Sequence, residues 1–341
     1  MADRYREAGV DLDAAERAKD RLSELVASTR DENTLSEMGL FGGLYAVPGN
    51  VPDPVLVSSA DGVGTKLKVA FLSGRHDTVG QCLVNHCVND ILVQGARPLF
   101  FLDYLATGAM DETVVTEVVQ GVAVACKENR CALLGGETAQ MPDFYAQDEY
   151  DLAGFIVGVV ARDKLLDGSR VGAGDVLIGL PSSGLHTNGY TLARKIVFDQ
   201  MGLRAGDEMP ELGRSVADVL LDVHRSYLGP LTPLLDADRI HALAHITGGG
   251  IPGNLPRVLP AGLGAVVDRT SWAPGPLFRL LRRAGDVERD EMYRVFNMGV
   301  GMILVVDAAE SDGVVRDLQD AGEAPWILGE IEPGDGVRYA D

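Results

Sequence analysis

The sequence Asp61-Gly62-Val63-Gly64-Thr65-Lys66 comes directly after the apolar run Val55-Leu56-Val57. Its two glycines permit positive φ angles and a close approach of the backbone to a ligand, so successive amide groups can point at one anion. The aspartate offers a carboxylate to a magnesium ion, and the threonine and lysine offer a hydroxyl group and a cation. This stretch therefore predicts a strand that ends in a polyphosphate-binding turn.

The spacing of this motif differs from that of two common nucleotide-binding loops. A P-loop requires Gly-x-x-x-x-Gly-Lys-Ser/Thr, whereas here the glycines lie closer together and threonine precedes lysine. A dinucleotide-dependent oxidoreductase requires Gly-x-Gly-x-x-Gly, and the third glycine is missing here. Taken alone, the hexapeptide also fits an ordinary Asp-Gly turn at the end of a strand, so the rest of the chain has to decide.

Length and composition predict a globular enzyme of about two domains, since the chain has 341 residues, 46% of them apolar and 23% charged. The N-terminus does not resemble a secretory leader, and no apolar stretch approaches membrane-spanning length. We therefore expect a cytoplasmic protein without a membrane partner. The four cysteines include no Cys-x-x-Cys pair, so we expect neither a zinc site nor a disulfide framework.

The chain is strongly acidic, with 30 basic and 50 acidic residues and a formal net charge of −20. This balance argues against a nucleic-acid partner, because phosphate backbones bind basic surfaces. It also repels small anions at long range, so binding of a nucleotide would depend on bound magnesium, aligned backbone amides and a few placed cations. Most of the carboxylates fit a solvated surface that aids solubility.

The hydrophobic periodicity breaks at residues 163–175, so we divide the chain into residues 1–168 and 169–341. In the first half the patterns predict helices at residues 12–26, 77–94 and 111–128 and strands at residues 55–57, 99–104, 131–134 and 152–160. In the second half they predict helices at residues 190–200 and 215–227 and strands at residues 176–180, 263–267 and 302–306. This alternation indicates a two-domain α/β or mixed α+β fold.

Two candidate sites lie in the first half. Asp90 sits among apolar residues of a predicted helix, so its carboxylate either faces water or meets a cation such as a metal ion. The sequence Gly135-Gly136-Glu137-Thr138 follows a predicted buried strand, at the edge where α/β folds tend to place ligands. A tight turn with a capping glutamate is the alternative for this second segment.

Two further candidates lie in the second half. Residues 181–190 connect a strand to a helix and carry hydroxyl groups, an amide and His186, which suits an anion cradle. Residues 245–250, His-Ile-Thr-Gly-Gly-Gly, contain three glycines in a row, which mark either a close approach of the backbone or a hinge. We expect His76 and His224 to be exposed and His86 to be a packed helix residue, which leaves His186 and His245 as functional candidates.

Together these segments resemble the phosphoribosylformylglycinamidine cyclo-ligase family, or aminoimidazole ribonucleotide (AIR) synthetases, of purine biosynthesis. The resemblance spans nearly the whole chain and is carried by residues 5–11, 39–43, 61–66, 89–90, 95–96, 98–104, 135–142, 151–158, 182–190, 245–250, 254, 256–257, 291–292 and 296–302. Small departures from the family pattern occur at Arg97, Gln140, Thr187, Thr191 and Val295. Because Gln140 replaces the usual glutamate, we do not expect a metal ligand there.

The resemblance implies an activity. Members of this family use ATP to phosphorylate the formyl oxygen of formylglycinamidine ribonucleotide, which gives an iminophosphate. The neighbouring amidine nitrogen then attacks the same carbon, phosphate leaves, and 5-aminoimidazole ribonucleotide is formed together with ADP. Because both reacting ends belong to one substrate, the ring closure is intramolecular. A nucleotide-binding regulator that consumes no ATP is the alternative from another functional class.

The resemblance also implies roles for particular residues. The magnesium ligands are expected to be Asp61, Asp90 and Glu137. The ATP-binding residues are expected to be Asp61, Gly62, Val63, Gly64, Thr65, Lys66, Gly135, Gly136 and Thr138. The substrate-binding residues are expected to be Ser182, Ser183, Asn188, Thr247, Gly248, Gly249 and Gly250. The catalytic residues are expected to be Lys66, Asp90, His186 and His245.

Finally, the resemblance implies a two-domain AIR synthetase-like fold and a homodimer. Residues 1–168 would form the ATP-binding and dimerisation domain, and residues 169–341 a carboxy-terminal α/β sandwich domain. Strands of the two amino-terminal domains would join in a barrel shared by the subunits. The expected ligands are ATP, Mg²⁺ and a phosphorylated small-molecule substrate.

Overall fold

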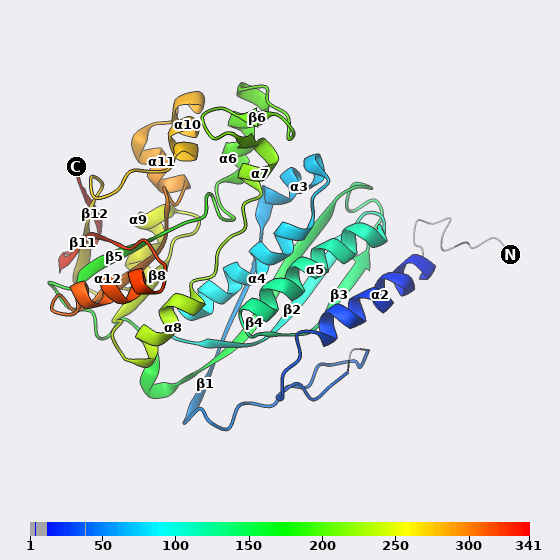
Figure 1. Cartoon of the computed structure of the whole chain (residues 1–341), viewed down its shortest axis with the longest axis horizontal. Helices are drawn as coiled ribbons and strands as arrows, with labels where there is room; N and C mark the ends of the chain where they lie inside the picture. The colour runs from blue at the N-terminus through cyan, green and yellow to red at the C-terminus, as the bar shows by residue number, and fades with distance from the viewer. Residues whose placement is uncertain (1–3, 5–11, 38) are drawn as a thin grey trace.

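The computed structural model describes residue 4, residues 12–37 and residues 39–341. The chain forms two halves that lie side by side, each built on its own β-sheet (Figure 1). The predicted mixed α/β class is confirmed. Residues 5–11, which contribute to the family resemblance, lie outside the described residues.

The first half contains a four-stranded sheet in the order β1-β4-β2-β3. Its strands are β1 (Pro54–Gly62), β2 (Arg97–Thr107), β3 (Ala132–Gln140) and β4 (Tyr150–Ala161). Strand β4 pairs antiparallel with β1 and β2, and β2 pairs parallel with β3. Three helices cover one face of this sheet (Figure 1): α2 (Leu12–Ala27), α4 (Asp77–Leu92) and α5 (Glu112–Glu128).

The opposite face of this sheet is open in the single chain. Along β4, Leu152 and Ile156 are buried under the helices, whereas Phe155 is 46% exposed. On the neighbouring strand β1, Leu56 is 58% exposed. Antiparallel strands such as β1 and β4 normally carry polar residues on a solvated face, so these exposed apolar side chains are unusual.

The predicted helices and strands of the first half are confirmed, with one exception in β3. Residues 135–138 continue the strand rather than forming a turn, and they pair with β2 as far as Gln140. The glycine at 136 is needed for this, because an added Cβ would lie 2.3 Å from Asp103 Oδ1. The missing side chain thus lets β3 run close beside β2.

The second half contains a six-stranded sheet in the order β12-β9-β11-β5-β10-β8. Its strands are β5 (Val176–Pro181), β8 (Ala242–His245), β9 (Leu263–Asp268), β10 (Val300–Val306), β11 (Trp326–Pro333) and β12 (Gly336–Ala340). Every residue of β10 is buried, as expected for an apolar strand that lies inside the sheet. Two short strands, β6 (Glu208–Met209) and β7 (Arg214–Ser215), form a separate pair.

Short helices lie around this second sheet and between it and the first half (Figure 1). They are α3 (Leu67–Ser73), which follows the 3-10 turn η1 (Gly64–Lys66), then α6 (Tyr190–Arg194), α7 (Val216–Leu220), α8 (Leu228–Asp236), α9 (Gly250–Asn254), α10 (Pro276–Gly285), α11 (Arg289–Val295) and α12 (Ser311–Asp320). Further turns are η2 (Arg162–Lys164) and η4 (Leu255–Val258), and the π-helical segment η3 (Lys195–Gln200) continues α6. The predicted helix at residues 190–200 therefore forms, although half of it is π-helical.

The prediction of one helix at residues 215–227 is wrong. Helix α7 ends at Leu220, and α8 begins only at Leu228. Between them, the carbonyl groups of His224 and Arg225 accept hydrogen bonds from Asn85 Nδ2 (2.8 Å) and Asn89 Nδ2 (2.9 Å) of α4. These carbonyls are satisfied by another part of the chain, so the segment does not need helical hydrogen bonds.

Helix α4 connects the two halves. Nearly all of its side chains are buried, because it packs on β1 and β4 on one side and on the segment before α8 on the other. One hydrophobic cluster runs from the first half into the second. The two halves therefore meet along a helix that carries Asp90.

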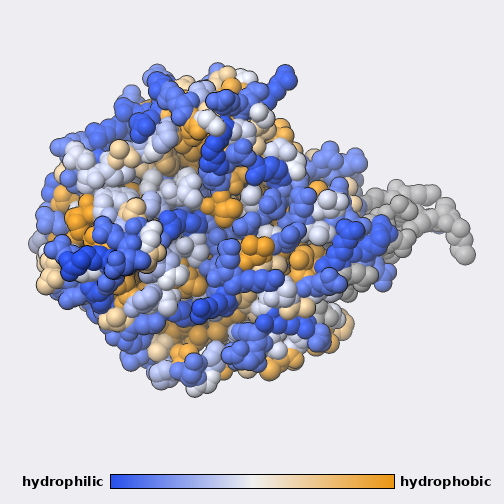
Figure 2. Space-filling model, viewed as in Figure 1, coloured by the Kyte–Doolittle hydropathy of each residue, from blue (hydrophilic) through white to orange (hydrophobic). Residues whose placement is uncertain are grey.

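Hydrophilic residues spread over the face of the molecule drawn in Figure 2, with apolar residues in small groups between them. Among the helices that the structure describes, none has the length and apolar character needed to cross a bilayer. The expected cytoplasmic location stays a prediction.

Candidate active site

Two carboxylates from different elements meet between the two halves. Asp61 lies at the end of β1, and Asp90 lies in the last turn of α4, which packs on β1. His86, one turn earlier on α4, places its Nε2 atom 2.9 Å from Asp61 Oδ2 and 3.7 Å from Asp90 Oδ2. On the side of the second half, His245 Nδ1 lies 2.9 Å from Asp90 Oδ1.

A cavity of about 480 Å³ opens over these side chains. Both halves contribute to its lining, which includes Ser58, Ser59, Asp61, His86, Asp90, Asp167, His245, Thr247, Asn254 and Arg257. Carboxylates outnumber arginines and lysines among these residues, so a cation bound beside Asp61 and Asp90 would be stabilised. The cavity is the place in the fold where two of the three predicted metal residues, Asp61 and Asp90, meet His245 and Thr247 of the segment at residues 245–250.

The hydrogen bonds in this cavity shift the pKa values of its groups. Burial disfavours the charged carboxylate of Asp61, but the hydrogen bond and charge of His86, together with the hydrogen bond from the Gly62 amide, outweigh it and lower the pKa of Asp61. In the same way, burial opposes the charge on Asp90, while hydrogen bonding to His245 and the nearby His86 lower its pKa. Burial also opposes the charge on His86, but Asp61 and Asp90 raise its pKa overall.

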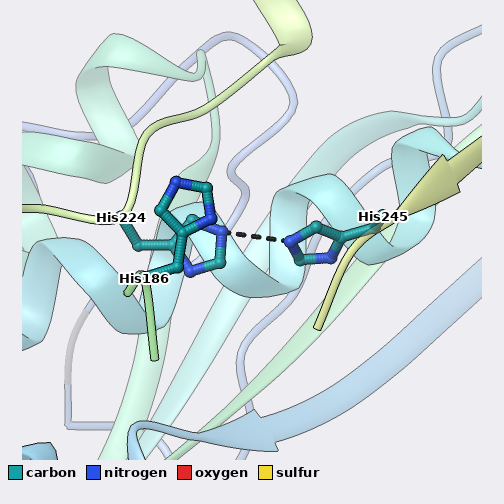
Figure 3. A group of neighbouring side chains, drawn as sticks. All are labelled: His186, His224 and His245. Atoms are coloured by element: carbon teal, nitrogen blue, oxygen red, sulfur yellow. Dashed lines mark hydrogen bonds between the residues drawn. The ribbon is translucent and has the colours of Figure 1, made fainter. Parts of the chain in front are cut away.

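Three histidines form a buried group beside these carboxylates (Figure 3). His224 Nε2 lies 3.0 Å from His245 Nε2, and the ring of His186 stacks on that of His224 with centroids 3.9 Å apart. Burial, reinforced by neighbouring positive groups, holds the pKa values of His186 and His224 well below the usual range. These two imidazoles are therefore neutral near pH 7.

The histidines were only partly predicted. The interpretation of His76 and His224 as exposed residues is wrong, because both are buried. His86 is packed on its helix, as expected, but it also contacts both carboxylates. No glycine-rich or hydroxyl-rich motif surrounds His86 or His224, so their approach to the site could be found only from the tertiary structure.

The turn at residues 61–66 has the expected shape in part. Gly64 has a φ of +54°, but Gly62 is the last residue of β1 and does not have a positive φ. Val63 is fully buried, and the Thr65 hydroxyl lies 3.0 Å from that of Thr191 at the start of α6. The turn thus joins the first half to the helix that follows the predicted anion loop.

Lys66, which the resemblance assigns to the ATP phosphates, does not line this cavity. Its side chain is fully buried, and Nζ donates to Cys82 Sγ (3.1 Å), the His186 carbonyl (2.9 Å) and the Asp222 carbonyl (2.6 Å). Burial opposes its charge, but Cys82 and Tyr190 raise the pKa of Lys66 overall. In this structure Lys66 connects the turn at residues 61–66 to the second half.

The loop at residues 182–190 is held by its own hydroxyl groups. Ser182 Oγ donates to the Gly184 carbonyl (2.9 Å), and Ser183 Oγ donates to the Val223 carbonyl (2.5 Å). His186 adopts a left-handed conformation with φ +61°, and its Nε2 accepts a hydrogen bond from the Ser183 amide (3.1 Å). These contacts shape the loop, so its two serine hydroxyls are engaged within the protein.

Close packing accounts for two of the three glycines at residues 248–250, and Gly249 has a φ of +93°, which favours glycine. An added Cβ at Gly250 would lie 2.0 Å from the Tyr293 carbonyl oxygen, and one at Gly248 would lie 3.0 Å from Asn188 Oδ1. Asn254 Nδ2 donates to the Gly248 and Gly250 carbonyls and braces the loop. Asn188 and Gly248 are therefore neighbours, as expected for residues of one substrate site.

Glu137 lies in a different hollow. It belongs to a space of about 740 Å³ that is also lined by Gly43, Tyr104, Phe155 and the remainder of residues 135–138. Strands β1 and β3 are the opposite edges of the four-stranded sheet, so one chain does not bring Glu137 to Asp61. Gly135, Gly136 and Thr138 also lie on β3 and are separated from Asp61 in the same way.

Comparison with known proteins shows which family the chain belongs to. Residues 16–160 match the family model described as AIR synthase related protein, N-terminal domain, and residues 172–341 match that of the C-terminal domain. The phosphoribosylformylglycinamidine cyclo-ligase of Sorangium cellulosum (strain So ce56) is 53% identical over 333 residues, which are 97% of this chain and 96% of that protein. The enzyme of the same name from Geotalea daltonii is 52% identical over 96% of this chain and 94% of its own.

The chain belongs to the phosphoribosylformylglycinamidine cyclo-ligase family. Solved structures with the same fold include a thiamine-monophosphate kinase from Stenotrophomonas maltophilia, with a TM-score of 0.70, 20% identity and coverage of 95% of this chain and 94% of that one. Another is the hydrogenase maturation protein HypE in complex with ATP, with a TM-score of 0.63, 17% identity and coverage of 92% and 86%. These likenesses establish that the cyclo-ligase has the fold of this wider group.

Proposed function

We infer that this cyclo-ligase closes the imidazole ring of 5-aminoimidazole ribonucleotide from formylglycinamidine ribonucleotide, with conversion of ATP to ADP and phosphate. The observation that carries this inference is the meeting of Asp61 and Asp90 from the first half with His245 from the second in one cavity. About 50% identity to cyclo-ligases over almost the whole chain supports it.

The proposed reaction has two steps. The formyl oxygen attacks the γ-phosphorus of ATP, the bond to ADP breaks, and an iminophosphate is formed. The amidine nitrogen then attacks the activated carbon, the carbon–oxygen bond breaks, and phosphate leaves as the nitrogen loses a proton. We assign this proton transfer to the hydrogen-bonded pair His245 and Asp90, because both line the cavity and the pair can exchange a proton along a 2.9 Å contact.

The donor set beside the cavity fits Mg²⁺ in part. Asp61 and Asp90 supply the oxygen ligands that Mg²⁺ prefers, and a cation shared between them would offset their mutual repulsion, as His86 does in part. When bound, the ion would neutralise charge on the ATP phosphates. Glu137 joins this proposed set only if a second copy of the chain brings it near, because it lies at the other edge of the sheet.

The remaining assignments follow from position. The backbone of residues 62–65 stays the proposed ATP-phosphate site, with Lys66 as a buried support rather than a phosphate ligand. Asn188, Thr247 and the glycines at 248–250 are proposed to contact the substrate, and His186 with the two serines to shape the loop beside it. Gly135, Gly136 and Thr138 would contribute to an ATP site only from a partner subunit.

We also propose a homodimer formed through the open face and edges of the first sheet. The exposed side chains of Leu56 and Phe155 on that face support an apolar interface, and exposed Leu40 and Phe41 lie at the hollow that contains Glu137. We propose that residues 1–168 form the domain for dimerisation and ATP binding, and that residues 169–341 form the carboxy-terminal AIR synthetase-like domain.

The function is tested by measuring ATP turnover together with aminoimidazole formation. We expect one ADP and one phosphate for each aminoimidazole ribonucleotide, and no ATP consumption without the amidine substrate. A protein that binds ATP but forms no aminoimidazole with this substrate would instead be a nucleotide-binding regulator. Asp90→Asn serves as the inactive comparison, and Asp312→Asn, on α12 and away from the cavity, as the matched control.

A further inference from the structure

Four side chains surround one point at the edge of the cavity: Asp61, His86, Asp90 and His245. One ligand atom each from His86, Asp90 and His245 lies within 4.8 Å of the other two, and Asp61 Oδ2 lies 2.9 Å from His86 Nε2. Two atoms that bind the same ion at about 2.1 Å lie roughly 3 to 4 Å from each other. These side chains therefore need only a small adjustment to hold one metal ion.

In His86 and His245, one ring nitrogen faces a carboxylate, and the other, outer nitrogen has a fixed partner. His86 Nδ1 lies 2.6 Å from Thr187 Oγ1, and His245 Nε2 lies 3.0 Å from His224 Nε2. Histidines that bind a metal usually donate this outer N–H to a neighbouring acceptor, which fixes the ring and its tautomer. The surroundings of His86 and His245 match this pattern.

Asn89 determines the direction of these hydrogen bonds. Asn89 Oδ1 accepts from the Tyr227 amide at 3.0 Å, so its Nδ2 is the atom that faces His224 Nε2, at 3.2 Å. A donor in that position requires His224 Nε2 to be unprotonated, with the proton of His224 on Nδ1. The lone pair of His224 Nε2 is then shared between Asn89 Nδ2–H and His245 Nε2–H, and His224 Nδ1–H can donate to Thr187 Oγ1 at 3.3 Å.

With their outer N–H groups donating to Thr187 and His224, the inner nitrogens His86 Nε2 and His245 Nδ1 can bind an ion that displaces the protons now joining them to the two carboxylates. We propose that Asp61, His86, Asp90 and His245 form a binding site for a divalent transition-metal ion, with Thr187 and His224 holding the two imidazoles in place. Mg²⁺ prefers oxygen ligands, whereas imidazole nitrogen favours ions such as Co²⁺ and Zn²⁺. A set of two nitrogens and two carboxylates therefore binds these ions more tightly than Mg²⁺.

The other buried histidine group does not provide such a site. His186 and His224 stack with an angle of 14° between their planes, so their in-plane lone pairs run nearly parallel and do not converge on one ion. His86 and His224 also lie outside the segments that carry the family resemblance, so the proposed ligand set is more than the Asp61 and Asp90 pair discussed above.

The test uses metal-free full-length protein without ATP or substrate, so its outcome does not depend on ring closure. Co²⁺ is titrated by its visible absorption, and Mg²⁺ by competition with Co²⁺. We expect one Co²⁺ per chain, bound at least ten-fold more tightly than Mg²⁺. His86→Leu should weaken Co²⁺ binding at least ten-fold and change Mg²⁺ binding less than three-fold, and His224→Gln should weaken Co²⁺ binding about ten-fold.

His241→Leu is the matched control, because His241 contacts Asp175 outside the cavity, and it should change neither affinity. If a variant fails to fold, a spectroscopic measurement on the unaltered chain still tests whether two histidines bind the metal ion. Electron spin echo modulation of bound Cu²⁺ should show couplings to two imidazole nitrogens. Equal affinities for Co²⁺ and Mg²⁺, Co²⁺ binding that is unaffected by His86→Leu, or an absence of nitrogen coupling would each overturn the proposal.

Discussion

Lys66 is a buried cation whose three hydrogen bonds join the turn at residues 61–66 to the second half. Its partners include the carbonyls of His186, which is buried, and Asp222, which is partly buried. A residue in this position contributes mainly to stability. A phosphate ligand, by contrast, would contribute mainly to nucleotide affinity.

We therefore predict that Lys66→Met lowers the free energy of unfolding by about 2–4 kcal/mol, because a buried and a partly buried carbonyl group lose a charged donor. Denaturant unfolding measures this change. ATP affinity, measured at a temperature where the variant is folded, should fall less than about three-fold. Unchanged stability combined with a large loss of ATP affinity would restore Lys66 as a phosphate ligand. Lys195→Met is the control, since its exposed side chain lies on η3.

The limits of prediction from sequence are clearest for single residues. Asp61, Asp90 and His245 could be placed at one site because each lies in a recognisable motif. His224 could not, because it is buried by α4 and by other histidines that are distant in the sequence. For Lys66 the motif indicates the chemistry of the side chain but not its direction, and the structure buries it between the two halves.

At the level of elements, helix α9 begins in the loop at residues 248–250. The space available for a Cβ atom differs between the glycines of this loop and helix. Gly250 has a φ of +62° and would place a Cβ 2.0 Å from the Tyr293 carbonyl oxygen, whereas Gly253 would place one 3.8 Å from the nearest backbone oxygen. We predict that Gly250→Ala lowers the free energy of unfolding by about 2–3 kcal/mol and sharply reduces turnover.

Gly253→Ala should change stability by less than about 1 kcal/mol, because alanine favours the helix and meets no close contact. Thermal unfolding of the two variants, together with their rates of aminoimidazole formation, makes the comparison. If both glycines tolerate alanine equally, the loop does not depend on the close approach to α11.

Strand β2 carries a buried carboxyl group, Asp103, beside Gly136 of β3. Burial raises the pKa of Asp103 to about 7. The folded chain therefore holds this proton more tightly than the unfolded chain, and the associated stability is present at low pH and lost as pH rises from about 4 to 7. We predict that Asp103→Asn becomes more stable relative to the unaltered chain between pH 5 and pH 8, by up to about 3 kcal/mol.

Melting temperatures of both proteins across this pH range measure the difference in stability. The contributions of the other titrating groups to that difference cancel, because both proteins have the same groups. A constant difference between the two proteins would show that Asp103 ionises normally in the folded chain.

The elements also show why some predictions succeeded. The strands at residues 152–160 and 302–306 are continuous apolar runs whose pattern survives in any context, and both form as expected. The segment at residues 221–227 has a helical pattern, but its carbonyl groups are satisfied by Asn85 and Asn89 from another half of the molecule. Tertiary hydrogen bonds of this kind cannot be predicted from the local sequence.

At the level of the whole molecule, the open face of the first sheet and the position of Glu137 lead to the same expectation. A second copy would cover Leu56 and Phe155 and would bring further groups to the edges of the sheet. We predict a homodimer by equilibrium sedimentation, with a specific activity that falls on dilution as the dimer dissociates. Phe155→Glu should shift the equilibrium toward monomer, because it places a charge on the apolar face, whereas Glu332→Gln on β11 should not.

A monomer whose specific activity is independent of concentration would remove both the shared sheet and any contribution of Glu137 from a partner. The ring-closing chemistry would still stand, since Asp61, Asp90 and His245 meet within one chain.

The central claim is that the formyl oxygen leaves as part of phosphate, and an isotope measurement tests it most directly. Formylglycinamidine ribonucleotide labelled with ¹⁸O at the formyl oxygen is incubated with the protein and ATP, and the released phosphate is analysed by mass spectrometry. The account predicts one ¹⁸O atom in each phosphate formed, in a one-to-one ratio with aminoimidazole ribonucleotide. Ring formation with unlabelled phosphate would contradict it, because the oxygen would then have left without being phosphorylated.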